Sequence, residues 1–70
     1  MKTRRYFIVY FKATRKRDGV TAYGDFRETT KGTDPDYEDI KNELNRQGYA
    51  DVEISRHEEV SKKLFNEWTA

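Results

Sequence analysis

The sequence contains no cysteine and only one histidine in its seventy residues. Without cysteine the chain forms no disulfide, offers no thiolate nucleophile and builds no cysteine-based zinc site. The single histidine, His57, has no second histidine with which to form a zinc triad. We therefore expect no cofactor and no metal site, and we expect a cytoplasmic protein, because a chain without disulfides suits a reducing compartment.

Long apolar runs are also missing. The longest, Tyr6 to Phe11, has six residues, which is shorter than the apolar core of a usual signal peptide and far below the roughly 20 residues of a membrane span. No small-residue cleavage site follows this run. The sequence therefore predicts neither a signal peptide nor a membrane partner.

The chain has little material for a deep pocket. A domain of seventy residues buries only about 60% of the surface that its unfolded chain exposes, so a substrate cavity would compete with the core for apolar side chains. No complete catalytic constellation is visible in the sequence. We expect one small domain, residues 1–70, that is not an enzyme.

Charge is plentiful and unevenly distributed. Charged residues make up 39% of the chain, and the 14% of aromatic residues argue for a folded domain despite this high charge. Residues 1–17 hold seven basic residues and no acid, a charge of +7, whereas residues 18–70 hold the other seven basic residues and all thirteen acids, a charge of −6. This layout predicts a bipolar molecule that steers charged partners.

Two extended segments open the chain. "RYFIVYFKAT", residues 5–14, is rich in β-branched and aromatic residues, and its continuous apolar run is typical of a central strand. Asp18–Gly19 predicts a two-residue hairpin turn that pairs Arg17 with Val20 and leads into a second strand over 20–30. A four-residue loop would keep the same faces, and a three-residue loop would exchange them. The face predicted to point to the core carries Phe7, Val9, Phe11, Ala13, Ala22, Gly24 and Phe26.

A helix is predicted after the second strand. Asp34 is suited to the N-cap and Pro35 to the first helical position. Gly48 is a suitable residue to end the helix. The side chains expected to face the core lie at helical spacing, and they are Tyr37, Ile40 and Leu44.

A third strand and a short helix complete the chain. Alternation predicts a strand that ends near Glu58, with Val52 and Ile54 on one face and Glu53, Ser55 and His57 on the other. "VSKKLFNEW" then predicts a short helix with Ser61 as its cap and a stripe of Val60, Leu64 and Trp68.

Together these segments predict an α+β fold with a β-β-α-β-α layout. A central first strand gives a three-stranded antiparallel sheet of order 2-1-3, with one helix packed on the sheet and a short C-terminal helix.

The basic hairpin is the first candidate site. Lys12, Arg15, Lys16 and Arg17 could contact the phosphates of a nucleic acid, or they could simply be solvated residues of an exposed turn. Tyr6, Tyr10 and Tyr23, on the face away from the core, could stack bases. The same face could instead be covered by the C-terminal helix, or it could form a dimer interface.

The acidic helix is the second candidate site. Asp36, Glu38, Asp39 and Glu43 could imitate a phosphate surface or dock on a basic groove of another protein. They also suit the positive end of a helix dipole, so a capped and solvated helix is the alternative. Farther along, a histidine beside carboxylates, His57 with Glu59, could form an acid–base pair. No nucleophile, second histidine or phosphate-binding loop accompanies them, so the sequence favours an exposed strand end.

The overall pattern resembles small hypothetical proteins of phages and prophages. The resemblance rests on "RRYFIVYFKAT", on "TTKG" before a helix and on the closing "EVSKKLFNEW". It implies an intracellular accessory protein without catalytic activity, and some proteins of this kind inhibit host machinery.

We therefore expect a binding protein, namely a protein-interaction module or phage-type accessory or inhibitor that acts through a bipolar charged surface. The alternative is a nucleic-acid-binding protein that uses the basic hairpin and the aromatic sheet face. The sequence leaves both a monomer and a homodimer open.

Overall fold

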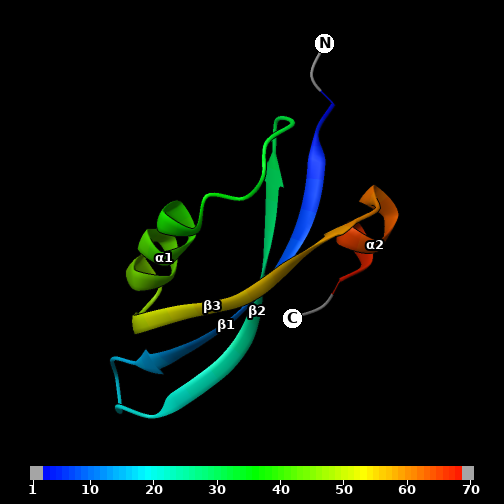
Figure 1. Ribbon diagram of the computed structural model, residues 1–70. Helices are drawn as coiled ribbons and strands as arrows, with labels where there is room; N and C mark the ends of the chain where they lie inside the picture. The colour runs from blue at the N-terminus through cyan, green and yellow to red at the C-terminus, as the bar shows by residue number, and fades with distance from the viewer. Residues whose placement is uncertain (1–2, 69–70) are drawn as a thin grey trace.

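A three-stranded antiparallel sheet with a helix on each face forms the structure (Figure 1). The computed structural model describes residues 3–68. Its elements are β1 (Arg5–Arg15), β2 (Thr21–Thr30), α1 (Tyr37–Arg46), β3 (Tyr49–Val60) and α2 (Lys62–Glu67). The sheet order is β2-β1-β3, and both neighbours run antiparallel to β1. The predicted fold class, strand order and layout are confirmed.

Burial of β1 on both faces organises the molecule. The face toward α1 carries Phe7, Val9, Phe11 and Ala13, all of which are buried. Two side chains of α1, Ile40 and Leu44, pack into the same core and are 1% and 2% exposed. On the opposite face, Ile8 is fully buried and 0% exposed. The continuous apolar run predicted such a central strand.

The β1–β2 connection is a four-residue loop, so the predicted two-residue turn is wrong. The Arg15 N–H donates to the Val20 carbonyl at 2.9 Å, and the Gly19 N–H donates to the Arg15 carbonyl at 2.7 Å. Gly19 has φ = 72°, a left-handed conformation that glycine adopts without strain. The pairing shifts by two residues, Phe11 lies opposite Gly24, and the predicted faces are therefore kept.

Gly24 lies directly against the Phe11 ring of the neighbouring strand. A Cβ at this position would lie 3.1 Å from the ring, which is tighter than ordinary van der Waals contact. A side chain here would therefore need the Phe11 ring to shift by a few tenths of an ångström.

Two irregularities in β3 change the predicted faces. Tyr10 pairs with Arg56 while Phe11 pairs with Ile54, so Ser55 is an extra residue on β3. A second register shift follows, near Asp51, whose φ is 51°. The strand also extends to Val60 rather than ending near Glu58.

Because of the extra residue, His57 lies on the same face as Ile54, toward α1. The sequence-based prediction placed these two side chains on opposite faces and is wrong, because it assumed unbroken alternation. The His57 ring makes an edge contact with Phe7, with centroids 5.6 Å apart. The predicted face shared by Val52 and Ile54 is confirmed, since both pack against the core.

The start of α1 differs from the prediction. Asp36, not Asp34, is the N-cap, and its carboxylate accepts from the Glu38 N–H at 3.0 Å and the Asp39 N–H at 3.4 Å. Pro35 therefore precedes the cap instead of opening the helix. Gly48 follows the last turn as predicted, with φ = 104°.

The cap assignment gives a direct test. The Asp36→Ala variant should lose about 1 kcal/mol of unfolding free energy, because two backbone donors lose their acceptor. Asp34→Ala is the matched control and should lose less, since Asp34 only pairs with Arg5 on the surface. Urea denaturation followed by circular dichroism measures both losses, and a larger loss for Asp34→Ala would contradict the assignment.

Candidate interaction surfaces

A hollow of about 500 Å³ lies at the hairpin end of the sheet. Three of its lining residues are the predicted cations Arg15, Lys16 and Arg17. The turn between α1 and β3 supplies the other three, which are Gln47, Gly48 and Tyr49. The sequence did not identify these three, because only the folded chain brings this turn beside the hairpin loop.

Hydrogen bonds hold two of the cations in place. The Arg15 guanidinium binds the Asp18 carboxylate, with the closest pair of atoms 2.8 Å apart. The Lys16 ammonium donates to the Asn45 backbone carbonyl at 3.1 Å and to its side-chain oxygen at 3.0 Å. The Lys16 N–H also donates to the Gly48 carbonyl at 2.9 Å. These contacts fix the hairpin loop against the C-terminal end of α1.

Two further predicted cations, Lys12 and Arg17, are exposed. Lys12 lies opposite Tyr23 on β2 and opposite Glu53 on β3. No hydrogen bond or ion pair of either cation is found among residues 3–68. Both side chains are therefore available to a partner.

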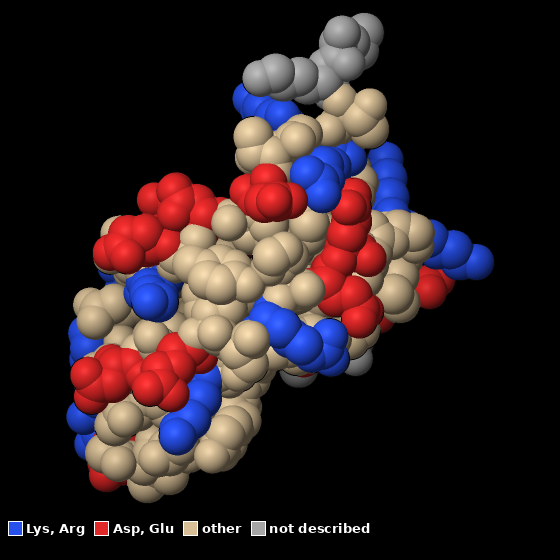
Figure 2. Space-filling view, in the orientation of Figure 1, with Lys and Arg blue, Asp and Glu red and all other residues tan. Residues whose placement is uncertain are grey.

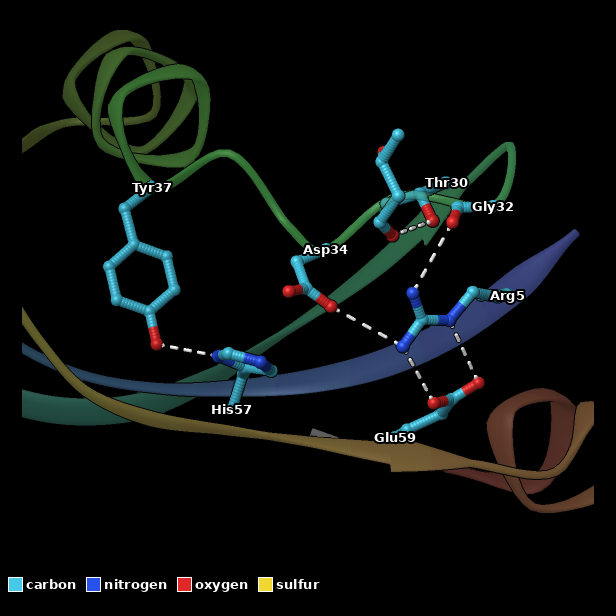
Figure 3. A network of polar contacts seen from close by, with 8 residues as sticks. Arg5, Thr30, Gly32, Asp34, Tyr37, His57 and Glu59 are labelled. Carbon is cyan, nitrogen blue, oxygen red and sulfur yellow. Dashed lines mark hydrogen bonds and ion pairs between the residues drawn. The ribbon is translucent and has the colours of Figure 1, made fainter.

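The basic residues near the N-terminus belong to the opposite end of β1. Arg5 lies ten residues before Arg15 along the strand, a separation of roughly 33 Å. Its guanidinium binds Glu59 at 2.9 Å and Asp34 at 3.3 Å (Figure 3). Lys2, one of the seven basic residues within residues 1–17, lies outside the described residues. Acidic and basic side chains thus alternate over the face in Figure 2.

The aromatic face is covered at one end. The Phe65 ring of α2 packs on Tyr6, with centroids 5.1 Å apart and the rings tilted by 53°. The Arg27 guanidinium lies over the Phe65 ring, 5.3 Å from its centroid, and donates to the Phe65 carbonyl at 3.2 Å. Tyr6 is therefore part of the packing beneath α2.

The Ser61 cap of α2 is confirmed, since its hydroxyl accepts from the Leu64 N–H at 3.1 Å. The predicted apolar stripe is only partly right, because Leu64 is 41% exposed and Phe65 makes the main contact with β1 instead.

The aromatic residues nearer the hairpin are less covered. Tyr10 is half-buried beneath Arg56, whose guanidinium lies 4.3 Å from the ring centroid. Tyr23 is 77% exposed. The open part of this face therefore offers one free ring, Tyr23, beside Lys12.

The acidic helix uses some of its carboxylates internally. Asp36 is the N-cap. Glu43 binds Arg46 and accepts from Gln47 at 3.4 Å, and the Arg46 hydrogen bond is the main reason that the pKa of Glu43 is lowered. Glu38 and Asp39 remain exposed. Of the four predicted contact residues, these two are the most accessible.

Glu28 of β2 was not singled out by the sequence, yet it faces this acidic helix. Partial burial raises its pKa, and the charges of Asp39 and Glu43 add to the increase. Its carboxylate also accepts from the Thr29 N–H at 3.1 Å, which acts in the opposite direction. Glu28 is thus a partly buried acid next to other acids.

The residues His57 and Glu59 share a face, as predicted, but they contact different partners (Figure 3). The His57 Nδ1 lies 2.6 Å from the Tyr37 hydroxyl, and Glu59 forms two hydrogen bonds with the Arg5 guanidinium. The Arg5 hydrogen bond lowers the pKa of Glu59, and the same bond raises the pKa of Arg5. Both side chains thereby link β3 to other elements.

Over residues 3–68, no three His, Asp or Glu side chains gather closely enough to hold a metal ion. No helix in this part of the chain is long and apolar enough to cross a membrane.

The Glu28→Gln variant should be more stable than the wild type at neutral pH. The change removes a partly buried charge but keeps an acceptor for the Thr29 N–H, and we expect a gain of about 0.5 kcal/mol or less because the site is partly solvated. The pKa of Glu28 is higher in the folded chain, so protonation favours folding. The difference in unfolding free energy between Glu28→Gln and the wild type should therefore shrink as the pH falls from neutral to about 4.

Glu59→Gln is the opposite-signed control. The pKa of Glu59 is lowered by folding, so this variant should be less stable than the wild type at neutral pH, with a difference that shrinks as pH falls through the lowered pKa. Thermal unfolding of all three proteins across this pH range measures both trends. A loss of stability in Glu28→Gln at neutral pH would refute the assigned cause.

Comparison of the chain with protein-family models, with curated proteins and with solved structures found no match. The features that bear on function are therefore the hollow at the hairpin end, the open part of the aromatic face at Tyr23 and the acidic helix.

Proposed function

We propose that the protein is a non-enzymatic protein-binding module whose hairpin end docks an acidic segment of another protein. The observation that carries the proposal is the convergence of three cations, Arg15, Lys16 and Arg17, on one hollow. The resemblance to phage and prophage proteins suggests an accessory or inhibitor of a host protein as the physiological form of this activity.

The hollow is suited to carboxylates. Arg15 already donates two hydrogen bonds to one carboxylate, that of Asp18. Because a guanidinium has five N–H donors, it can also donate to a second carboxylate. Arg17 is exposed beside it. Prior fixation of Arg15 and Lys16 by internal bonds reduces the entropy lost when a partner binds.

The hollow also offers an apolar contact. Tyr49 is half-buried and packs its ring edge-on against Phe11, with centroids 5.7 Å apart. A tyrosine held in this way presents a rigid surface at low entropic cost. The mixture of cations and a fixed aromatic ring fits an acidic peptide that carries an apolar side chain.

The extent of the basic surface favours a protein over a nucleic acid. Tight duplex binding usually rests on many phosphate contacts, whereas Arg5 is engaged by Glu59 and Asp34 at the far end of β1. Tyr6 is covered by Phe65. The cations at the hairpin thus form a short patch and not a continuous track.

Neutralising the patch should weaken the binding of acidic peptides. For the triple variant Arg15→Ala, Lys16→Ala, Arg17→Ala we expect affinity for a fluorescent Glu-rich peptide containing leucine to fall by about tenfold or more, since three exposed charge contacts of about 0.5 kcal/mol each are lost. Fluorescence anisotropy at low and moderate salt measures this change. A triple change of Lys31, Lys62 and Lys63 to Ala removes the same charge elsewhere and should leave the affinity unchanged.

The probes separate the two classes of partner. A single-stranded oligonucleotide of equal charge serves as competitor. Stronger binding of the oligonucleotide than of the peptide would replace the present proposal with nucleic-acid binding. Equal losses in both triple variants, or no binding of either probe at low salt, would overturn the hairpin site altogether.

Nucleic-acid binding remains the second candidate because of one specific observation. Tyr23 is 77% exposed and lies opposite Lys12 on the neighbouring strand. An exposed ring next to a cation can stack a base while the cation contacts the phosphate. Arg17 at the loop could provide a further phosphate contact.

If this second function operates, Tyr23→Ser should weaken binding of single-stranded DNA by about 1 kcal/mol or more, because one stacking surface is lost. Leu64→Ser removes an exposed apolar side chain on α2 and is the control. An oligonucleotide titration that gives the same affinity for Tyr23→Ser and the wild type would exclude base stacking at this ring.

A further inference from the structure

The two outer strands of the sheet differ in how their free edges are built. β3 is interrupted by register shifts near Ser55 and Asp51. Bulges of this kind protect an edge from pairing with another strand. β2, in contrast, pairs with β1 through ten consecutive residues without a shift. It contains no proline, lysine or bulge.

The register identifies which backbone groups of β2 point outward. The Arg15 N–H donates to the Val20 carbonyl, and antiparallel strands alternate between bonded and non-bonded pairs. The even-numbered residues of β2 therefore bond to β1. The outward groups belong to Thr21, Tyr23, Asp25, Arg27 and Thr29.

One outward group is already occupied. The Thr29 N–H donates to the Glu28 carboxylate at 3.1 Å, which supports the assigned alternation and closes the edge at this end. At the other end the strand gives way to the hairpin loop at Gly19. The open edge thus runs from Thr21 to Arg27, and its midpoint is Gly24.

We propose that a second copy of the chain pairs with this open edge, β2 against β2 in antiparallel orientation, to form a continuous six-stranded sheet. A two-fold axis at Gly24 places Thr21 opposite Arg27 of the second copy and Tyr23 opposite Asp25. Every outward group from Thr21 to Arg27 then has a partner, because each of these pairs exchanges two hydrogen bonds.

Charge complementarity selects this register over its neighbours. A shift by one step centres the axis on Asp25 and places two Asp25 carboxylates directly opposite one another, which is destabilising. A shift in the other direction centres the axis on Tyr23 and leaves Arg27 beyond the partner's strand, beside the loop residue Gly19. In the register centred on Gly24, no two like charges lie directly opposite one another.

The side of the sheet that faces α1 adds apolar contact. Ala22 of one copy lies opposite Phe26 of the other, and the two Gly24 residues meet at the axis. Phe26 is only half-buried in the single chain, and α1 packs chiefly on β3. Pairing of the two edges therefore covers an apolar side chain that the monomer leaves partly open.

Sedimentation equilibrium of the wild type from about 10 µM to 1 mM, together with amide hydrogen exchange by NMR, tests the pairing. We expect a monomer–dimer equilibrium in which the amides of Tyr23, Asp25 and Arg27 become protected as the dimer forms. The Thr29 amide should change little. A monomer at every concentration, or a dimer that leaves these three amides unprotected, would overturn the proposal.

Introduced cysteines test the register, since the native chain has none. Opposed bonded residues lie about 5.5 Å apart between Cα atoms, which a disulfide can span. A mixture of Tyr23→Cys and Asp25→Cys chains should therefore form the mixed cross-link faster than Tyr23→Cys cross-links to itself. Preferred cross-linking of Tyr23→Cys with itself would contradict the Gly24 axis.

Asp25→Pro removes one outward N–H and none that pairs with β1. Circular dichroism checks that the variant folds, and its dimer should then dissociate at concentrations at least about tenfold higher than those for the wild type. Glu59→Pro on β3 is the matched edge control, because Glu59 lies opposite Phe7, which bonds to β2, so its N–H points outward. It should leave association unchanged. If either proline variant fails to fold, the wild-type exchange and cross-linking experiments still decide the question.

Discussion

Burial of β1 on both faces is the constraint on which the rest of the structure depends. Phe7 and Val9 require a cover on one side and Ile8 requires one on the other. Residues 3–68 contain two helices to supply them, so α1 covers one face and the six-residue α2 covers part of the other. Few apolar side chains remain for a cavity, and the groups able to bind a partner lie at the ends and edges of the sheet.

The same constraint decides where the charges lie. Because β1 crosses the whole sheet, its basic residues are divided between its two ends, with Arg5 at one and the hairpin cations at the other. Lys16 at the hairpin binds the last turn of α1 at Asn45, while Asp34, shortly before α1, binds Arg5 at the other end of β1. A charge separation that is clear along the sequence becomes interleaved in space. The hairpin cations are therefore better described as a local site than as one pole of the molecule.

The parts of the fold set by side-chain pattern were predictable, and those set by local backbone competition were not. The apolar run of β1 and the spacing of Ile40 and Leu44 specify a central strand and its helix without reference to other segments. Asp34 and Asp36 are equally good caps by residue type, so only the path of the chain from β2 decides between them. The extra residue at Ser55 cannot be recognised from the alternation of apolar and polar residues. It places His57 on the face opposite to the one predicted. Half of the residues that line the hollow could be predicted, because its three cations are adjacent in the sequence. Gln47 and Tyr49 lie beside them only after folding.

The two proposed surfaces have a geometric relation that bears on binding strength. Pairing of β2 about Gly24 places the hairpin loops of the two copies at opposite ends of the shared strands, roughly 30 Å apart. Each dimer would then present two hollows that point away from one another. A partner with a single acidic segment would gain little from this arrangement, whereas an oligomeric partner would bind through both hollows, with the second contact strengthened by effective concentration. A weak patch of three cations would thereby become selective for assembled partners over isolated acidic peptides.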